Sequence, residues 1–503
     1  MHNFAQVDWG PDEAKDDANI PNYFFPISGF SEIVAGKIRY VIGRKGSGKT
    51  AIIERIKNDL DSEPLAFYSQ LSLRNFPVNL FSSLQDRSKA DKSKYVSAWQ
   101  FILYVELSKL ILRDQGALPF VVVEELRSFL SINSFDSELG FSETVTILTN
   151  NQNQVSIKAG MMSAFSNSGG GQQNLVKVHY TKVVEVLSRL IGGIESESEY
   201  RLFFDELDEG YKSDDDRINL MILALIRAVE DTALFAKKRG MNFNPLLVLR
   251  SDIFDLLEDN DLNKIYDYSL KLKWSLAPEI ASGPALDDEK LMTLRNVVNN
   301  RISASVPMSS AILDVWHGVV HDLDPDIPHS VGSLWKYIAN RTFERPRDIL
   351  KFLKYARLNQ KSGKLTYAAI EQTEVEYSGW LYNEIRDEIQ SHLKVWSESL
   401  NVITRIGRGI FTYDEFLISL NKEKEIVAWL STHSKDPLDI ANLLFRFGVI
   451  GNLGNDGKRW LFGYKDSSLA FDSEMKMIVH YGLHKKLRLT SNKQEYLKVE
   501  AWN

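Results

Sequence analysis

The sequence contains no cysteine among its 503 residues. This absence excludes disulfide bonds, thiolate metal sites, iron–sulfur clusters and cysteine nucleophiles, and it makes a cytoplasmic location the simplest expectation. Long apolar runs are absent as well, since no stretch approaches the roughly 18 apolar residues of a membrane-spanning helix. The first residues lack the basic and apolar segments of a signal peptide. We therefore expect neither secretion nor a membrane partner.

An excess of positive charge is also lacking. The chain has 60 Lys and Arg against 67 Asp and Glu, a net charge of −7. This balance argues against a wholly basic nucleic-acid coat, although a local basic face is still compatible with it. With 44% hydrophobic and 25% charged residues, the composition is that of an ordinary globular protein. The length is sufficient for about three domains.

What the sequence does contain is a phosphate-binding loop of the pattern G-x-x-x-x-G-K-[ST], from Gly43 to Thr50. An apolar run at 38–42 precedes it, and apolar residues at helical spacing follow it, so the glycines lie on a strand-to-helix turn. Backbone N–H groups of such a turn surround phosphates at the positive end of a helix. We expect the nucleotide to contact Gly43, Arg44, Lys45, Gly46, Ser47, Gly48, Lys49, Thr50 and Ala51.

The roles within this loop follow from its chemistry. Lys49 would reach the β- and γ-phosphates, and the Thr50 hydroxyl would bind Mg²⁺. A second apolar strand, residues 200–204, ends in adjacent carboxylates. Asp205 would hold the Mg²⁺ shell, and Glu206 would orient and deprotonate the attacking water. The two motifs together predict an Mg²⁺-dependent ATPase site with a Walker A loop and a Walker B strand.

Strands alternate with helices around these motifs, which predicts an α/β fold with a parallel sheet. Residues 113–180 interrupt this alternation with a predicted β-hairpin insertion. The remaining core elements are expected as strands at 64–73, 244–252 and 270–275 and helices at 97–112, 181–191 and 218–236. Strand 244–252 ends at the sheet edge where ligands bind, so Arg250 is a candidate γ-phosphate sensor.

The second half of the sequence predicts two further parts. Helices at 287–301 and 309–320, and an amphipathic helix at 341–357 that starts with a proline, form a helical lid. From Phe411 to Asp466, three helices and two short strands have the order of a winged helix, a module that binds DNA or proteins.

These features together resemble the AAA+-like and STAND-type ATPases. Within them the sequence is most similar to bacterial P-loop ATPases found in defence-type gene neighbourhoods and to origin-recognition initiators. The resemblance implies that Arg250 matches the strand-end sensor and that Arg347, in the motif Arg345-Pro346-Arg347, matches the lid-domain sensor. The chain departs from the family pattern in two respects. About 155 residues separate the loop from Asp205, and no arginine finger can be placed.

The resulting hypothesis is an ATP-binding and hydrolysing switch in which the γ-phosphate closes the lid on the core. Its expected parts are a lead-in segment (1–37), the ATPase core (38–280), the lid (281–400) and the winged helix with its tail (401–503). The alternatives are a DNA-binding initiator or loader and a nucleotide-binding scaffold with little turnover.

The expected partner is a protein or effector encoded nearby, in anti-phage defence, and homo-oligomer formation is a further expectation. The winged helix and the hairpin tip at Gly169–Gly171 would make the protein contacts, since the wing offers only Lys458 and Arg459 to DNA. Nucleic-acid contact has weaker support, from the cations of the lid: Arg341, Arg345, Arg347, Lys351, Lys354 and Arg357.

Overall fold

The computed structural model describes residues 3–74, 76–86, 89–90, 93–135, 140–158, 175–207, 211, 215–257, 262–274, 294–307, 314–328, 332–454, 459–466 and 468–490. The expected hairpin tip at Gly169–Gly171 and the wing residue Lys458 lie outside these ranges. The chain divides into two compact units. We call residues 29–44 and 49–272 the sheet unit, and residues 1–28, 45–48 and 273–503 the helical unit. The tip of the phosphate loop, 45–48, thus belongs to the helical unit.

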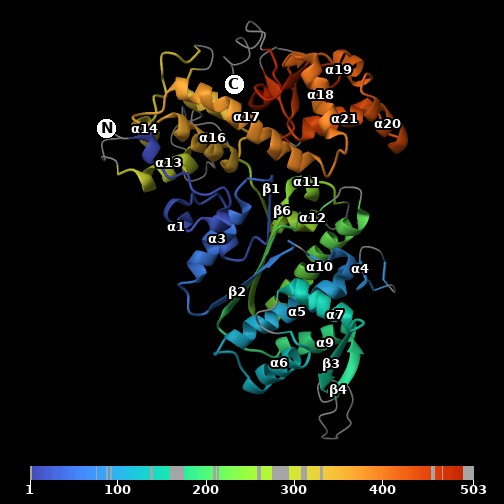
Figure 1. The fold of residues 1–503 in the computed structure, drawn as a ribbon. Coiled ribbons are helices and arrows are strands. Elements are labelled where there is room, and N and C mark those ends of the chain that lie inside the picture. Colours follow the sequence, from blue (N-terminus) through green and yellow to red (C-terminus); the bar gives the residue numbers. More distant parts are fainter. Residues whose placement is uncertain are drawn as a thin grey trace. The chain divides into compact units, whose positions relative to one another are not determined.

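The sheet unit contains a sheet of five parallel strands in the order β2-β5-β6-β1-β7. Strands β1, β2 and β6 of this sheet are labelled in Figure 1. The strands are β1 (Tyr40–Gly43), β2 (Ala66–Ser72), β5 (Glu199–Asp205), β6 (Asn242–Arg250) and β7 (Ser269–Lys271). In β5 every residue after the first is buried, because helices cover both faces of a parallel sheet. The predicted α/β fold with a P-loop NTPase core and a parallel sheet is confirmed.

Outside the insertion at 113–180, the long helices described in this unit are α3 (Lys49–Leu60), α5 (Val96–Arg113), α9 (Tyr180–Ile191) and α10 (Asp216–Lys238). Helix α5 packs against both α9 and α10, and its side chains are buried around most of its circumference. The Trp99 indole N–H donates to the carbonyl oxygen of Met221 at 2.9 Å, which joins α5 to α10. Shorter helices are α2 (Phe30–Val34), α4 (Val78–Ser82), α11 (Ser251–Phe254), α12 (Leu262–Ile265) and the 3₁₀ turn η4 (Tyr266–Tyr268).

The insertion contains more structure than the sequence indicates. Strands β3 (Gln154–Lys158) and β4 (Leu175–His179) pair antiparallel, so the predicted hairpin is confirmed. Two helices, α6 (Phe120–Ile132) and α7 (Phe141–Asn150), precede it and were not predicted. Three consecutive valines in α6 favour a strand by propensity. Packing of α6 on α5, α9 and β3 instead buries its apolar side and makes it helical.

The helical unit begins with the N-terminal segment, which contains η1 (Phe4–Gln6), η2 (Ala14–Asp16) and α1 (Ile20–Tyr23). Phe4, Val7 and Trp9 are buried in the same core as the later helices. These helices are α13 (Leu294–Ser305), α14 (Val315–Val319), α15 (Leu334–Ala339), α16 (Pro346–Asn359), α17 (Tyr367–Ile389) and α18 (Trp396–Ile406). Pro346 occupies the first turn of α16, as predicted. Helix α14 covers the later part of the expected helix 309–320, while residues 309–313 and the start of the expected helix 287–301 lie outside the described residues.

The last part of the helical unit has the element order expected for a winged helix. Three helices, α19 (Tyr413–Leu420), α20 (Lys424–His433) and α21 (Pro437–Arg446), precede the antiparallel strands β9 (Ile450–Leu453) and β10 (Trp460–Leu461). Two further strands, β8 (Ile410–Phe411) and β11 (Met477–Val479), complete a sheet of order β10-β9-β11-β8, and η6 (Tyr481–Leu483) follows. In the described part of the chain, no helix combines the length and apolar character needed to span a membrane.

Candidate functional site

Four neighbouring strands of the sheet unit, β2, β5, β6 and β1, end side by side, and their last residues are Ser72, Asp205, Arg250 and Gly43. Ser72 is the register partner of Asp205, and Gly43 is the register partner of Arg250. Ligands of parallel sheets bind at this carboxyl edge. The register therefore brings together residues of the two predicted motifs that are far apart in the sequence.

Two glycines of the loop have backbone conformations that other residues rarely adopt. The φ angle is +77° at Gly46 and +98° at Gly48. A β-carbon at Gly46 would also lie 2.9 Å from the Arg347 β-carbon. An L-residue at 46 would therefore be strained and crowded at once.

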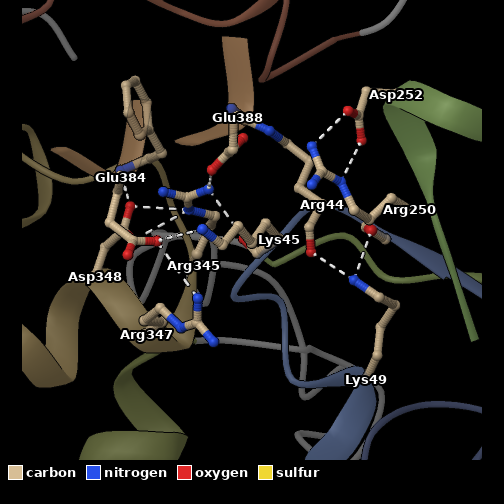
Figure 2. Close-up of polar contacts among 12 residues, drawn as sticks. Arg44, Lys45, Lys49, Arg250, Asp252, Arg345, Arg347, Asp348, Glu384 and Glu388 are labelled. Carbon is tan, nitrogen blue, oxygen red and sulfur yellow. Dashed lines mark hydrogen bonds and ion pairs between the residues drawn. The ribbon is translucent and has the colours of Figure 1, made fainter. Parts of the chain in front are cut away.

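Lys49 is the first residue of α3 and folds back over the loop. Its ammonium group donates to the carbonyl oxygens of Gly43 and Arg44, both at 3.0 Å (Figure 2). The chain reverses closely enough here for the lysine to reach the carbonyls five and six residues before it. The positive charge of Lys49 therefore lies at the loop, which is the position expected for the lysine of this motif.

Thr50 and Asp205 meet although 155 positions separate them in the sequence. The Thr50 hydroxyl donates to Asp205 Oδ2 at 3.0 Å. A hydroxyl and one carboxylate fit Mg²⁺, which keeps several waters and takes its other ligands from nucleotide phosphates. Among the described residues, no group of three or more His, Cys, Asp or Glu side chains forms a metal site of the all-protein kind.

Burial raises the pKa of Asp205 above its ordinary value. Hydrogen bonds from the Glu206 N–H and the Thr50 hydroxyl, and the charge of Lys49, act in the opposite direction but do not offset burial. A buried carboxylate of this kind favours a cation beside it, because the cation compensates for lost hydration.

Glu206 has a left-handed backbone, with φ at +57°, directly after the strand ends. Such a conformation costs about 1–2 kcal/mol for a residue with a β-carbon. It lets the Glu206 N–H donate to Asp205 Oδ1 at 2.8 Å, while the Ser72 hydroxyl donates to the Glu206 carboxylate. Ser72 therefore holds the predicted base, a contact that the sequence analysis missed. A polar residue at the end of the neighbouring strand was the available signal.

Arg250 lies at the predicted strand end but has a partner of its own. Its guanidinium donates to both carboxylate oxygens of Asp252, at 3.0 Å from Nε and 2.6 Å from Nη2 (Figure 2). Arg250 is thus placed at the carboxyl edge, beside Gly43 in register.

Arg345 and Arg347 flank Pro346 and lie near the loop tip within the helical unit. The Arg347 N–H donates to the Gly46 carbonyl oxygen at 3.2 Å, and its guanidinium lies 3.4 Å from Glu384. Lys45 Nζ lies 3.6 Å from the same glutamate. Arg345, in contrast, is almost completely buried.

The lid cations expected to offer a nucleic-acid surface are engaged inside the helical unit. Arg341 pairs with Glu374 at 2.6 Å. Lys351 and Lys354 both bind Asp12, and Arg357 donates to the Val7 carbonyl oxygen at 3.1 Å. These charges therefore fasten the N-terminal segment and neighbouring helices, which weakens the argument for nucleic-acid contact at the lid.

Comparisons with known proteins give limited likenesses. Residues 292–386 match the family model of the FunZ-associated C-terminal helical domain. No curated protein matches the chain. Among solved structures, the chain is similar to the Cdc6p protein of Pyrobaculum aerophilum, with 10% identity over 90% of this chain and 85% of that one, at a TM-score of 0.29. The matched helical segment corresponds to α13 to α17.

Proposed function

We propose that the chain is an Mg²⁺-dependent ATPase of AAA+-like type that works as a molecular switch. The observation that carries the proposal is the hydrogen bond between Thr50 and Asp205 at the carboxyl edge of the sheet, beside a loop with two left-handed glycines. If a glycine-rich turn matched the loop pattern by chance, we would not expect its threonine to bind the carboxylate at the end of a strand that is distant in the sequence.

The residues have distinct proposed roles. The loop amides and Lys49 bind the phosphates, and Thr50 and Asp205 hold Mg²⁺, which neutralises charge on the phosphates when bound. Glu206 orients and deprotonates the attacking water, with Ser72 fixing its carboxylate. Arg250 and Arg347 respond to the γ-phosphate.

The test separates binding from turnover. Lys49→Ala should abolish ATP binding because it removes the charge that neutralises the phosphates. Glu206→Gln should keep ATP affinity and reduce turnover by about 10²-fold or more, because it removes only the base. Calorimetric titration with ATP and a phosphate-release assay measure the two effects.

Asp61→Asn, a change at an exposed carboxylate after α3, serves as the matched control and should affect neither. Equal ATP affinity in Lys49→Ala and the unaltered protein would overturn the site assignment. ATP binding without turnover in the unaltered protein would instead favour the nucleotide-binding scaffold.

We further propose that the ATP state controls a protein partner or effector encoded nearby, in bacterial anti-phage defence. The support is the resemblance to STAND-type ATPases and the near-balanced charge of residues 411–466. The order of three helices and a hairpin in α19 to β10 favours a second candidate equally, a DNA-binding initiator or loader. Salt-dependent DNA binding distinguishes the two candidates.

A further inference from the structure

Three consecutive carbonyl groups at the tip of the phosphate loop accept hydrogen bonds from other residues of the helical unit. The Lys45 carbonyl oxygen accepts from Arg345 Nη1 at 2.9 Å (Figure 2). The Gly46 carbonyl oxygen accepts from the Arg347 N–H at 3.2 Å, and the Ser47 carbonyl oxygen accepts from the Trp274 indole N–H at 2.9 Å. The tip is therefore held from its carbonyl side at every residue from 45 to 47.

The donor at Lys45 is itself fixed. The Arg345 side chain is 2% exposed, and its Nε lies 3.0 Å from Asp348 Oδ2 while Nη1 lies 2.5 Å from Glu388 Oε1. Asp348 in turn accepts the Phe343 N–H at 3.0 Å. A planar guanidinium held by two carboxylates cannot rotate, so the third hydrogen bond, to the loop, has a fixed direction.

The geometry of the peptide bond relates these carbonyls to the phosphate side of the loop. In a trans peptide the C=O of one residue and the N–H of the next point in opposite directions within one plane. Holding the carbonyls of residues 45, 46 and 47 therefore directs the N–H groups of Gly46, Ser47 and Gly48 away from the lid residues. Successive amides that share a direction form an anion-binding nest.

We propose that Arg345 is a positioning residue for this nest and not a phosphate ligand. It acts through the Lys45 carbonyl, with Trp274 acting in the same way through Ser47, and it orients the loop amides before nucleotide arrives. This role rests on the proposed nucleotide site. It differs from that of Arg347, whose link to the loop is a backbone N–H and whose side chain is 31% exposed.

Two substitutions test the role. Arg345→Lys keeps the positive charge but removes the planar fork, so one ammonium cannot serve both carboxylates and the loop in the same geometry. Trp274→Phe keeps an aromatic ring and removes only the indole N–H. We expect faster deuterium exchange at residues 45–48 of the nucleotide-free protein in both variants, and ADP affinity lowered by about tenfold in Arg345→Lys and severalfold in Trp274→Phe.

Arg341→Lys is the matched control. Arg341 is a partly buried arginine of this unit, with a side chain that is 12% exposed, and it pairs with Glu374 and donates to the Tyr337 carbonyl oxygen at 2.9 Å. The Arg341→Lys variant should be less stable than the unaltered protein, but deuterium exchange at residues 45–48 and ADP affinity should not change. A merely structural role for Arg345 would make the two arginine variants behave alike.

Unchanged loop exchange in both Arg345→Lys and Trp274→Phe would overturn the inference. If Arg345→Lys does not fold, the Trp274→Phe result decides. Failure of the proposed function has a different signature: the unaltered protein would not bind ADP, while deuterium exchange would still report whether these residues order the loop.

Discussion

Arg347 is the residue whose sequence-based role is most open to a direct test. We predict that Arg347→Ala lowers the ATP hydrolysis rate by about tenfold or more and changes ATP affinity much less, because the guanidinium acts on charge that develops at the γ-phosphate. The substitution leaves the Arg347 N–H on Gly46 intact. Turnover and ATP affinity, measured on the same preparation, check this. Normal turnover would make Arg347 a solvated residue of α16.

The sequence predicted the residues whose identity is dictated by spacing, and it missed those whose role depends on folded neighbours. Gly43 to Thr50 and Asp205 follow from fixed motifs, and the structure brings Thr50 and Asp205 together. Ser72 reaches Glu206 only because of the register between β2 and β5. Arg345 was visible beside a proline, but its buried carboxylates and its bond to Lys45 arise only after the helical unit has folded.

At the scale of single elements, the segment around η6 contains a buried histidine that should make the protein sensitive to acid. Burial, helped by the charges of Arg341 and Lys485, lowers the pKa of His484 to about 4, against the effects of Glu374 and of the bond to the Val479 carbonyl oxygen. Between the ordinary pKa of about 6.5 and this value, the unfolded chain binds a proton that the folded chain does not. The contribution of His484 to the free energy of unfolding is therefore fully present above about pH 6.5. It is lost as the pH is lowered from there towards 4, by up to about 3 kcal/mol in total.

His484→Gln removes this titration and retains an N–H for the Val479 carbonyl oxygen. Denaturant unfolding at pH 7 and pH 5 should show a smaller loss of stability in the variant than in the unaltered protein. His433→Gln, at an exposed position of α20, is the control and should leave the pH dependence as it is. An equal loss in all three proteins would assign the acid sensitivity to other groups.

Elements were predictable where the apolar pattern was long or a turn signal was strong. Strand β5 and helix α5 were identified because continuous apolar runs mark buried elements. Strands β8 and β11, of two and three residues, are too short to show periodicity. Helices α6 and α7 were missed because their packing partners α5 and β3 override local preference.

At the scale of the whole molecule, the charge distribution predicts weak binding to nucleic acid. The lid cations are paired internally, and the exposed residues of α21 include Leu438 and Asn442, which carry no charge. We expect duplex DNA to bind only at low salt and without dependence on ATP. Binding titrations at low and physiological salt, with and without ATP, check this, alongside co-purification of the protein encoded nearby.

Tight, ATP-dependent DNA binding that is lost when Lys458 and Arg459 are both changed to alanine would support the initiator instead. Removing two lid cations, Lys351 and Lys354, provides the comparison. Because both bind Asp12, their loss should free the N-terminal segment and leave DNA binding unchanged.

The assignment of residues 45–48 to the helical unit has a consequence for dissecting the chain. A fragment ending at residue 272 would keep all five strands, Lys49, Thr50 and Asp205, and by motif it would contain a full nucleotide site. It would lack Trp274, Arg345 and Arg347, the donors to the three tip carbonyls. A boundary drawn from the motifs would thus separate the tip of the phosphate loop from the residues that hold it, which extend to Arg345 and to Glu388, the carboxylate that fixes Arg345.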